Sequence, residues 1–356
     1  GKTSSQQAKL VVGADGINSK VRECLATQDA DAFAGWSNFN PKKFVPRKWR
    51  SPSSFQRIKV LQLPPRFKIP DGQGGHITSR GKITYALRSI YNSPRKYLSL
   101  GLLPMKNDDV VRPTNIVTRP DHEIWKYKDG KSVREWFEKA YPRFPFHEDG
   151  GLISDEEWDR FASAEGTRFP ACQYTPGMAT CDDDGKCGVA LVGDAIHAFP
   201  PDIGQGVNAG LADVVALGRA LKGDDTVTGS SVKKSGNEPE FKANLDRYQA
   251  QHSPETAALI RLARFGAPYQ YRQPHRIDRL RAKLWTANVL LRLLLNKLTF
   301  GLVPMQCILL SQNAALTYRQ VMRRADIASR SLKAIVFGVL VMMLKKRLAS
   351  VLPFLG

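Results

Sequence analysis

One stretch of the chain combines an apolar run, a tight turn and a segment of helix-forming residues. Residues 189–192 are apolar and predict a short buried strand. Gly193 and Asp194 follow, and a loop rich in proline and glycine leads to a predicted helix over residues 206–221. Its apolar positions recur at helical spacing and predict an apolar face made of Val207, Leu211, Val214, Val215 and Leu217.

A second stretch repeats this order near the beginning of the chain. Residues 10–13 are apolar up to the glycine and predict a strand. Asp15 and Gly16 predict a tight turn, and Ser19 lies where it would cap the first turn of a following helix. The two stretches are separated by about 170 residues.

The chain between the two stretches is rich in predicted strands. Residues 58–63, 83–87 and 97–103 carry β-branched, leucine and aromatic residues that favour strands, and helices are predicted near 132–140 and 155–164. Residues 222–240, rich in glycine, serine and aspartate, predict a solvated insertion. A helical region is expected from Phe241 onward.

The turn at Gly193 and Asp194 has the chemistry of a ligand site. Glycine lets the backbone approach a ligand closely, and Asp194 would lie at the carboxyl end of a strand, where open α/β sheets bind ligands. Its carboxylate accepts hydrogen bonds from sugar-like hydroxyls. The helix start near Gly206 offers unpaired N–H groups and a positive dipole end, which favour negative charge. We assign His197 to packing or hydrogen bonding rather than to proton transfer.

Both stretches resemble motifs of the class A FAD-dependent aromatic-ring monooxygenases. Residues 189–213 are similar to the second FAD-binding motif of that family, and residues 10–22 are similar to its Asp-Gly motif. Within the family, the resemblance extends to kynurenine monooxygenases through residues 132–142, 168–174 and 312–323 and through the Gly-Gln-Gly-Val-Asn-Ala-Gly string at 204–210.

The resemblance implies an enzyme, its cofactors and its cofactor-binding residues. It implies an FAD-dependent monooxygenase that uses NADPH and O2, through a flavin C4a-hydroperoxide, to insert one oxygen atom into an organic, aromatic, kynurenine-like small molecule. It leaves the catalytic residues unassigned. The cofactor-binding residues it implies are Asp15, Arg22, Gly193, Asp194, Pro201, Gly204, Gln205, Gly206, Val207 and Asn208.

The fold implied is a mixed α/β (α+β) fold with an incomplete Rossmann-like FAD-binding domain. Residues 1–50 and 181–265 are expected to form parts of that domain, 51–180 an inserted β-sheet substrate domain, and 266–356 a C-terminal helical region. The family begins with a Gly-x-Gly-x-x-Gly unit that this sequence does not contain in a strand–helix context. We therefore expect a chain that lacks the N-terminal third of such an enzyme.

Composition limits the partners and the compartment. The 356 residues are 42% hydrophobic, which is enough for two domain cores. Lysine and arginine number 53 against 33 acidic residues, so the net charge of +20 favours anionic partners. No nucleic-acid-binding module accompanies the basic runs at 42–50 and 272–283, so nucleic acid is not expected.

Five cysteines without a pairing pattern indicate an intracellular location, and no metal site is predicted.

The C-terminal region raises the question of a membrane. Residues 334–344 are uncharged and apolar between Lys333 and a basic run, and residues 284–304 are also strongly apolar. Because a spanning helix needs about 20 apolar residues, an interfacial or re-entrant anchor fits better than a span. An ordinary buried helix remains equally open. The kynurenine-monooxygenase resemblance implies the mitochondrial outer membrane.

Two other functions stay open at this point. One is a flavin epoxidase acting on an isoprenoid substrate. The other is a truncated, FAD-free remnant that acts as a membrane-associated interaction protein.

Overall fold

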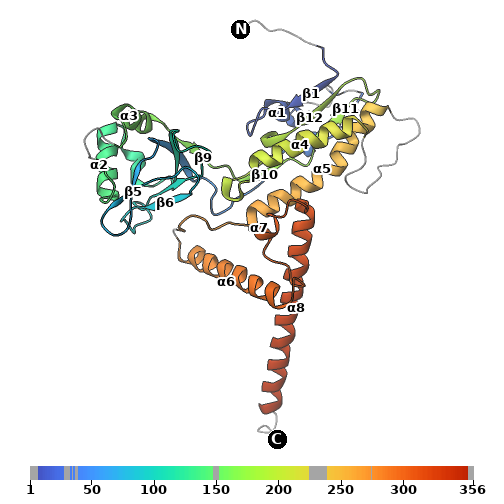
Figure 1. The fold of residues 1–356 in the computed structure, drawn as a ribbon. Coiled ribbons are helices and arrows are strands. Elements are labelled where there is room, and N and C mark those ends of the chain that lie inside the picture. The colour runs from blue at the N-terminus through green and yellow to red at the C-terminus, as the bar shows by residue number, and fades with distance from the viewer. Residues whose placement is uncertain are drawn as a thin grey trace. The chain divides into compact units, whose positions relative to one another are not determined.

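The chain divides into two compact units. A computed structural model describes residues 7–27, 33, 35–36, 39–146, 152–223, 239–273 and 275–351 (Figure 1). The larger unit comprises Gly1–Ser51, Ala171–Gln270 and Ile277–Gly356, and the smaller unit comprises Pro52–Pro170 and Tyr271–Arg276. Most of the predicted solvated insertion at 222–240 lies outside the described residues.

The larger unit contains a three-stranded sheet in the order β1–β12–β11. Strand β1 (Leu10–Gly13) pairs in parallel with β12 (Gly188–Leu191), which pairs antiparallel with β11 (Ala179–Cys181). Helix α1 (Lys20–Thr27) follows β1. Helices α4 (Gly206–Leu221) and α5 (Glu240–Phe265) lie side by side, and α5 also contacts β11 and β12 (Figure 1).

A second small sheet and the C-terminal helices complete the larger unit. Strand β10 (Cys172–Tyr174) pairs antiparallel with both β13 (His197–Ala198) and β2 (Arg47–Trp49). Helix α5 also packs against α7 (Cys307–Leu310) and α8 (Tyr318–Val351), while α6 (Arg276–Leu298) is tied to α8 by a bond from Arg292 to Ser329. Among the described residues, no helix is both long and apolar enough to cross a membrane.

The smaller unit is a five-stranded antiparallel sheet covered by two helices. The strand order is β6 (Tyr85–Arg88), β7 (Ser99–Leu102), β8 (Arg112–Thr118), β3 (Arg57–Leu63) and β9 (Thr167–Arg168). Side chains of Asp129 and Ser154 cap the starts of α2 (Gly130–Ala140) and α3 (Asp155–Ser163). Their aromatic faces pack on the sheet in one buried core. A hairpin of β4 (Lys68–Pro70) and β5 (His76–Thr78) adds a separate ribbon.

Short 3₁₀ helices connect several of these elements. They span Pro41–Phe44, Glu123–Lys126, Gly193–Ala195 and Pro201–Ile203. The last two lie between β12 and α4, in the stretch that carries the predicted site.

The mixed α/β fold predicted from the sequence is confirmed, and so are the bounds of α4. The apolar face predicted for α4 is mostly exposed, and of its five residues only Leu217 is buried. Its apolar positions Val207, Leu211, Val214 and Val215 are 50–78% exposed. The helix buries instead a narrower face of Ala209, Asp213, Leu217 and Ala220. Ala209 on this face and Gly210 next to it are small, and Gly210 lies close to the Gly193 turn.

Candidate functional site

The two predicted turns lie at the same edge of one sheet. In the parallel pairing of β1 with β12, Gly13 is opposite Leu191, and the N–H of Val192 donates to the carbonyl of Gly13 at 3.0 Å. Both strands therefore end together, and the segments carrying Asp15 and Asp194 leave from neighbouring positions. This is the edge at which open α/β sheets bind ligands.

Arg22 joins the two turns directly. Its side chain is buried, and Nη1 donates to the carbonyl of Ala195 at 2.7 Å while Nη2 donates to the carbonyl of Ile17 at 2.6 Å. Burial lowers the pKa of Arg22 from its ordinary value, and the nearby charge of Asp15 opposes that effect. The guanidinium thus fastens the segment after β1 to the segment after β12.

Asp15 organises the start of α1. Its Oδ2 accepts from the N–H groups of Lys20 at 2.6 Å and Val21 at 3.2 Å, and Ser19 Oγ accepts from the N–H of Arg22 at 3.0 Å. Burial would raise the pKa of Asp15, but hydrogen bonds from Ser19 and from these backbone groups hold it below 3.8. The carboxylate is ionised and fixes the turn that presents Arg22.

The turn after β12 depends on two glycines. Gly193 has a φ of +63°, a conformation that side chains disfavour. A Cβ added to Gly210 on α4 would lie 3.6 Å from the Cα of Gly193, so helix and turn are in close contact. Asp194 follows on the exposed side of the turn. Its carboxylate is therefore accessible to a ligand.

The start of α4 is open. Gly204 has a φ of +61°, and a Cβ added to Gly204 or Gly206 would meet nothing within 4 Å. Gln205 stands at the N-cap without a side-chain capping bond, because its Oε1 accepts instead from the hydroxyl of Tyr318 at 3.1 Å. Pro201, Val207 and Asn208 are exposed around this helix start. Free N–H groups at an open helix start suit the electron-rich edge of a flavin, so these residues fit FAD.

All ten predicted cofactor residues thus lie in the larger unit, on the segments that follow β1 and β12. Next to them lies a buried cluster whose pairing was not predicted from the sequence. Asp213 Oδ2 accepts from the N–H of Gly193 at 2.7 Å and from His197 Nε2 at 2.8 Å, and Oδ1 accepts from His252 Nε2 at 2.5 Å. No local pattern reveals it, because His252 lies 39 residues further along the chain.

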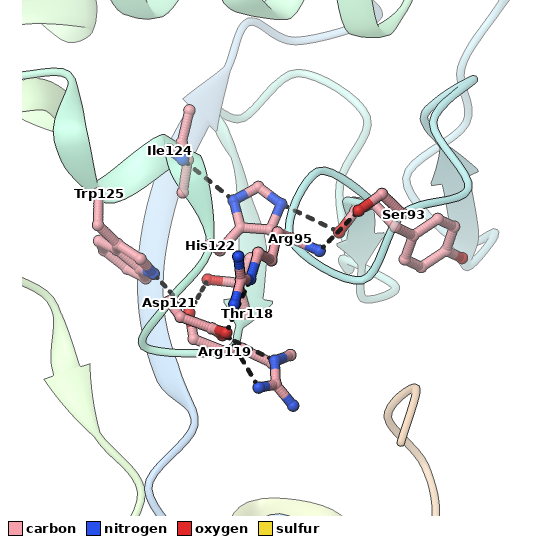
Figure 2. Close-up of polar contacts among 9 residues, drawn as sticks. Ser93, Arg95, Thr118, Arg119, Asp121, His122, Ile124 and Trp125 are labelled. Atoms are coloured by element: carbon pink, nitrogen blue, oxygen red, sulfur yellow. Dashed lines mark hydrogen bonds and ion pairs between the residues drawn. The ribbon is translucent and has the colours of Figure 1, made fainter. Parts of the chain in front are cut away.

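The smaller unit holds a second polar cluster, centred on His122 (Figure 2). His122 Nδ1 accepts from the N–H of Ile124, and Nε2 donates to the carbonyl of Tyr97, both at 3.1 Å. Burial lowers the pKa of His122 below 6.5. Asp121 pairs with Arg119 and Arg95 at the surface beside it. Because backbone groups occupy both ring nitrogens, this cluster stabilises loops rather than offering a reactive group.

A family comparison points to the same part of the larger unit. Residues 177–231 match the family model described as an FAD binding domain. This range contains β12, the Gly193 turn and all of α4.

Whole-chain comparisons find oxygenases. The chain is 25% identical over 277 residues to the FAD-dependent monooxygenase cdmI of Talaromyces verruculosus, covering 75% of this chain and 49% of that protein. It is 24% identical over 267 residues to kynurenine 3-monooxygenase of Flavobacterium johnsoniae, covering 74% and 47%. A solved structure of tetrameric 2-methyl-3-hydroxypyridine-5-carboxylic acid oxygenase matches with a TM-score of 0.43 and 19% identity, covering 73% of this chain and 53% of that one.

The chain spans about half the length of the curated relatives it matches. The matched FAD-binding segment and the monooxygenase relatives agree with the motifs at residues 10–22 and 189–213. The chain is thus similar to FAD-dependent monooxygenases over about three quarters of its length, and its residues 177–231 match an FAD binding domain.

Proposed function

We propose that this chain supplies the flavin-ring and substrate-domain part of a monooxygenase that uses FAD, NADPH and O2 to insert one oxygen atom into an aromatic, kynurenine-like molecule. The observation that carries the proposal is the bond between Arg22 and the carbonyl of Ala195, which fastens two predicted cofactor turns at one sheet edge. An open helix start follows the second turn.

Each residue has a proposed role toward the cofactor. Asp194 would accept hydrogen bonds from ribityl hydroxyls, because it is an exposed carboxylate on a fixed turn. Gly206, Val207 and Asn208 would donate backbone N–H groups to the pyrimidine edge. Pro201, Gly204 and Gln205 would shape the loop, and Asp15 and Arg22 would hold the two turns in register.

The chemistry divides between cofactor and protein. FAD, when bound, supplies the redox chemistry that NADPH and O2 require. The protein binds and orients the ring, and the positive end of the α4 dipole stabilises negative charge at its pyrimidine edge. The turns at Gly193 and Gly204, both with positive φ, would orient these groups toward the cofactor.

Flavin binding tests the proposal directly. The purified chain is titrated with FAD and followed by quenching of flavin fluorescence and by absorbance near about 450 nm. Asp194→Ala is expected to weaken FAD binding by roughly tenfold, the effect of losing one or two hydrogen bonds to a ligand. Asp184→Ala is the matched control, because Asp184 is an exposed carboxylate on the β11–β12 hairpin. A chain that binds no FAD, or equal affinities for both variants, would contradict the proposal.

Substrate class is tested separately. Oxidation of NADPH by the FAD-loaded chain is expected to accelerate with kynurenine. Acceleration by isoprenoid lipids instead would support the epoxidase, and failure to bind FAD would support the remnant.

A second candidate property is association with an anionic membrane surface. Helix α6 exposes Leu284, Leu290 and Leu294 by 55–61%, and Phe300 just beyond it is fully exposed. Arg276, Arg279, Arg281 and Lys283 lie in its first turns. An apolar face with adjacent basic residues is typical of interfacial helices.

Vesicle co-sedimentation tests this association. The chain is expected to bind phosphatidylserine-containing vesicles more strongly than neutral ones, and Leu290→Glu is expected to reduce that binding several-fold. Ile77→Glu, at a position 52% exposed in the smaller unit, is the control. Equal binding to neutral vesicles, or no binding, would contradict it.

A further inference from the structure

A buried carboxylate lies directly beneath the proposed flavin turn. Asp213 on α4 is only 1% exposed, yet it forms no ion pair with lysine or arginine among the described residues. Its three hydrogen-bond donors are the backbone N–H of Gly193 and the imidazoles of His197 and His252. Burying a charge costs free energy, and here three hydrogen bonds offset that cost. So complete a set of donors indicates that the surrounding structure depends on the carboxylate.

The geometry points the carboxylate at the backbone of the turn. Oδ2 accepts the N–H of Gly193 at 2.7 Å, one residue before Asp194. Gly193 has a positive φ, which glycine adopts about as readily as a negative one, so a further contact is needed to select this conformation of the turn. A charge-assisted bond to this N–H holds the turn, and with it the direction in which Asp194 leaves the sheet.

The two histidines hold the carboxylate from different elements. His197 on β13 is 1% exposed, and its other ring nitrogen, Nδ1, has no hydrogen-bond partner in the described part of the chain. Among the described residues, the imidazole of His197 therefore forms its hydrogen bond to Asp213 alone. His252 on α5 stacks on Tyr248, with ring centroids 5.8 Å apart, and Tyr248 in turn donates to the carbonyl of Leu191 at the end of β12. The cluster therefore ties α4, α5 and β13 to the strand end that carries the turn.

We propose that Asp213 is a positioning residue for the flavin, acting through the Gly193 N–H and held by His197 and His252. It touches neither flavin nor substrate in this role. It sets the place of the Asp194 carboxylate. This inference rests on the proposed function, because it assigns Asp194 to the flavin.

Two readouts separate the inference from the function on which it rests. The first is hydrogen exchange of the Gly193 amide in the full chain labelled with ¹⁵N-glycine, which needs no cofactor. The second is the dissociation constant for FAD. Asp213→Ala is expected to speed exchange of the Gly193 amide by roughly tenfold or more and to weaken FAD binding by a similar factor.

Conservative variants and controls make the test specific. Asp213→Asn keeps one acceptor oxygen and is expected to fall between wild type and Asp213→Ala. His252→Gln keeps an N–H donor and is expected to rescue most of the loss seen in His252→Ala. Asp246→Asn, an exposed carboxylate on α5, removes the same charge without touching the turn. Leu262→Ala lowers the stability of the same unit from a position in the α5 core and controls for general loosening.

The outcomes decide between the ideas. Unchanged exchange at Gly193 in Asp213→Ala would overturn the inference. So would FAD affinity that falls equally in Leu262→Ala and Asp213→Ala. If the wild-type chain binds no FAD, the proposed function fails, and faster exchange confined to the Gly193 amide would show only that Asp213 holds the turn.

Discussion

The sheets of the two units differ in how far their apolar residues are buried. The smaller unit packs α2 and α3 on a five-stranded sheet around large aromatic side chains that are almost completely buried. In the larger unit, β1 exposes Val11 and Val12 by more than 40%, and in the described part of the chain it has a strand neighbour on one side only. Parallel pairing is normally found where both faces of a sheet are covered.

The exposed apolar residues lie in the unit that also carries the predicted cofactor residues. The smaller unit has a closed core that its own residues explain. The predicted cofactor residues belong to the unit whose sheet and α4 leave valines and leucines exposed. A ligand that binds only the folded state adds its binding free energy to such a region, so we expect FAD to stabilise the larger unit more than the smaller one.

Removing one ring from the aromatic core should give the largest effect. Phe137 is 0% exposed and contacts the rings of Trp158 and Phe161 at centroid distances of 5.1 and 6.0 Å. Phe137→Ala is expected to lower the free energy of unfolding by about 3–5 kcal/mol in urea denaturation. Ile90→Ala, at a position 60% exposed in the same unit, should change it by less than about 0.5 kcal/mol. Similar losses in both would mean that the core is looser than the contacts indicate.

Breaking the bridge between the turns should come next. Arg22→Met keeps most of the side-chain volume but leaves the carbonyls of Ala195 and Ile17 without these donors. The free energy of FAD binding is expected to weaken by about 1–3 kcal/mol, which is a roughly tenfold or greater loss of FAD affinity. Lys20→Met removes an exposed charge on the same helix and should have little effect. If both variants bind FAD as wild type does, the bridge does not organise the site.

A buried lysine should make the stability of the smaller unit depend on pH. Lys59 Nζ donates to the carbonyls of Phe161 at 2.8 Å and Ala162 at 3.3 Å, at the end of α3. Burial, with smaller contributions from Lys128 and Arg57, lowers the pKa of Lys59 to about 8 from 10.5. Between these values the unfolded chain binds more protons than the folded one, so stability should rise with pH from about 8 to about 10.5.

The size of the effect is set by linkage, at about 1.4 kcal/mol for each unit of pKa difference. Urea denaturation of wild type and Lys59→Met across this pH range measures it. The variant should show a flatter dependence, since the group that titrates is gone. Parallel curves for the two proteins would show that Lys59 keeps its proton when folded.

The sequence predicted local structure better than it predicted which surfaces are covered. The helix at 206–221 was predictable because helix-forming residues follow a glycine-rich loop. Strands β2, β10 and β13 were not predicted, since segments of two or three residues carry no periodic pattern. The pairing of Asp213 with His252 was hidden for another reason. Only the packing of α5 beside α4 brings them together.

The exposed face of α4 is the sharpest example. Periodicity marks Val207, Leu211, Val214 and Val215 as one apolar stripe, but it says nothing about what lies opposite. The structure turns Ala209 and Asp213 inward, because only small or hydrogen-bonded side chains fit against the Gly193 turn.

The smallest predicted effect tests whether that face is free in solution. Leu211→Ala and Val214→Ala replace side chains that are 61% and 54% exposed, so little burial is lost, and alanine favours helix slightly. Unfolding free energies should stay within about 0.5 kcal/mol of wild type. Leu217→Ala on the same helix is the matched comparison, because Leu217 is 6% exposed and its loss should cost about 2–5 kcal/mol. If Leu211→Ala cost as much as Leu217→Ala, and if that cost grew with protein concentration, the face would be covered by a second molecule. The contrast between the two units would then belong to the isolated chain and not to the protein in solution.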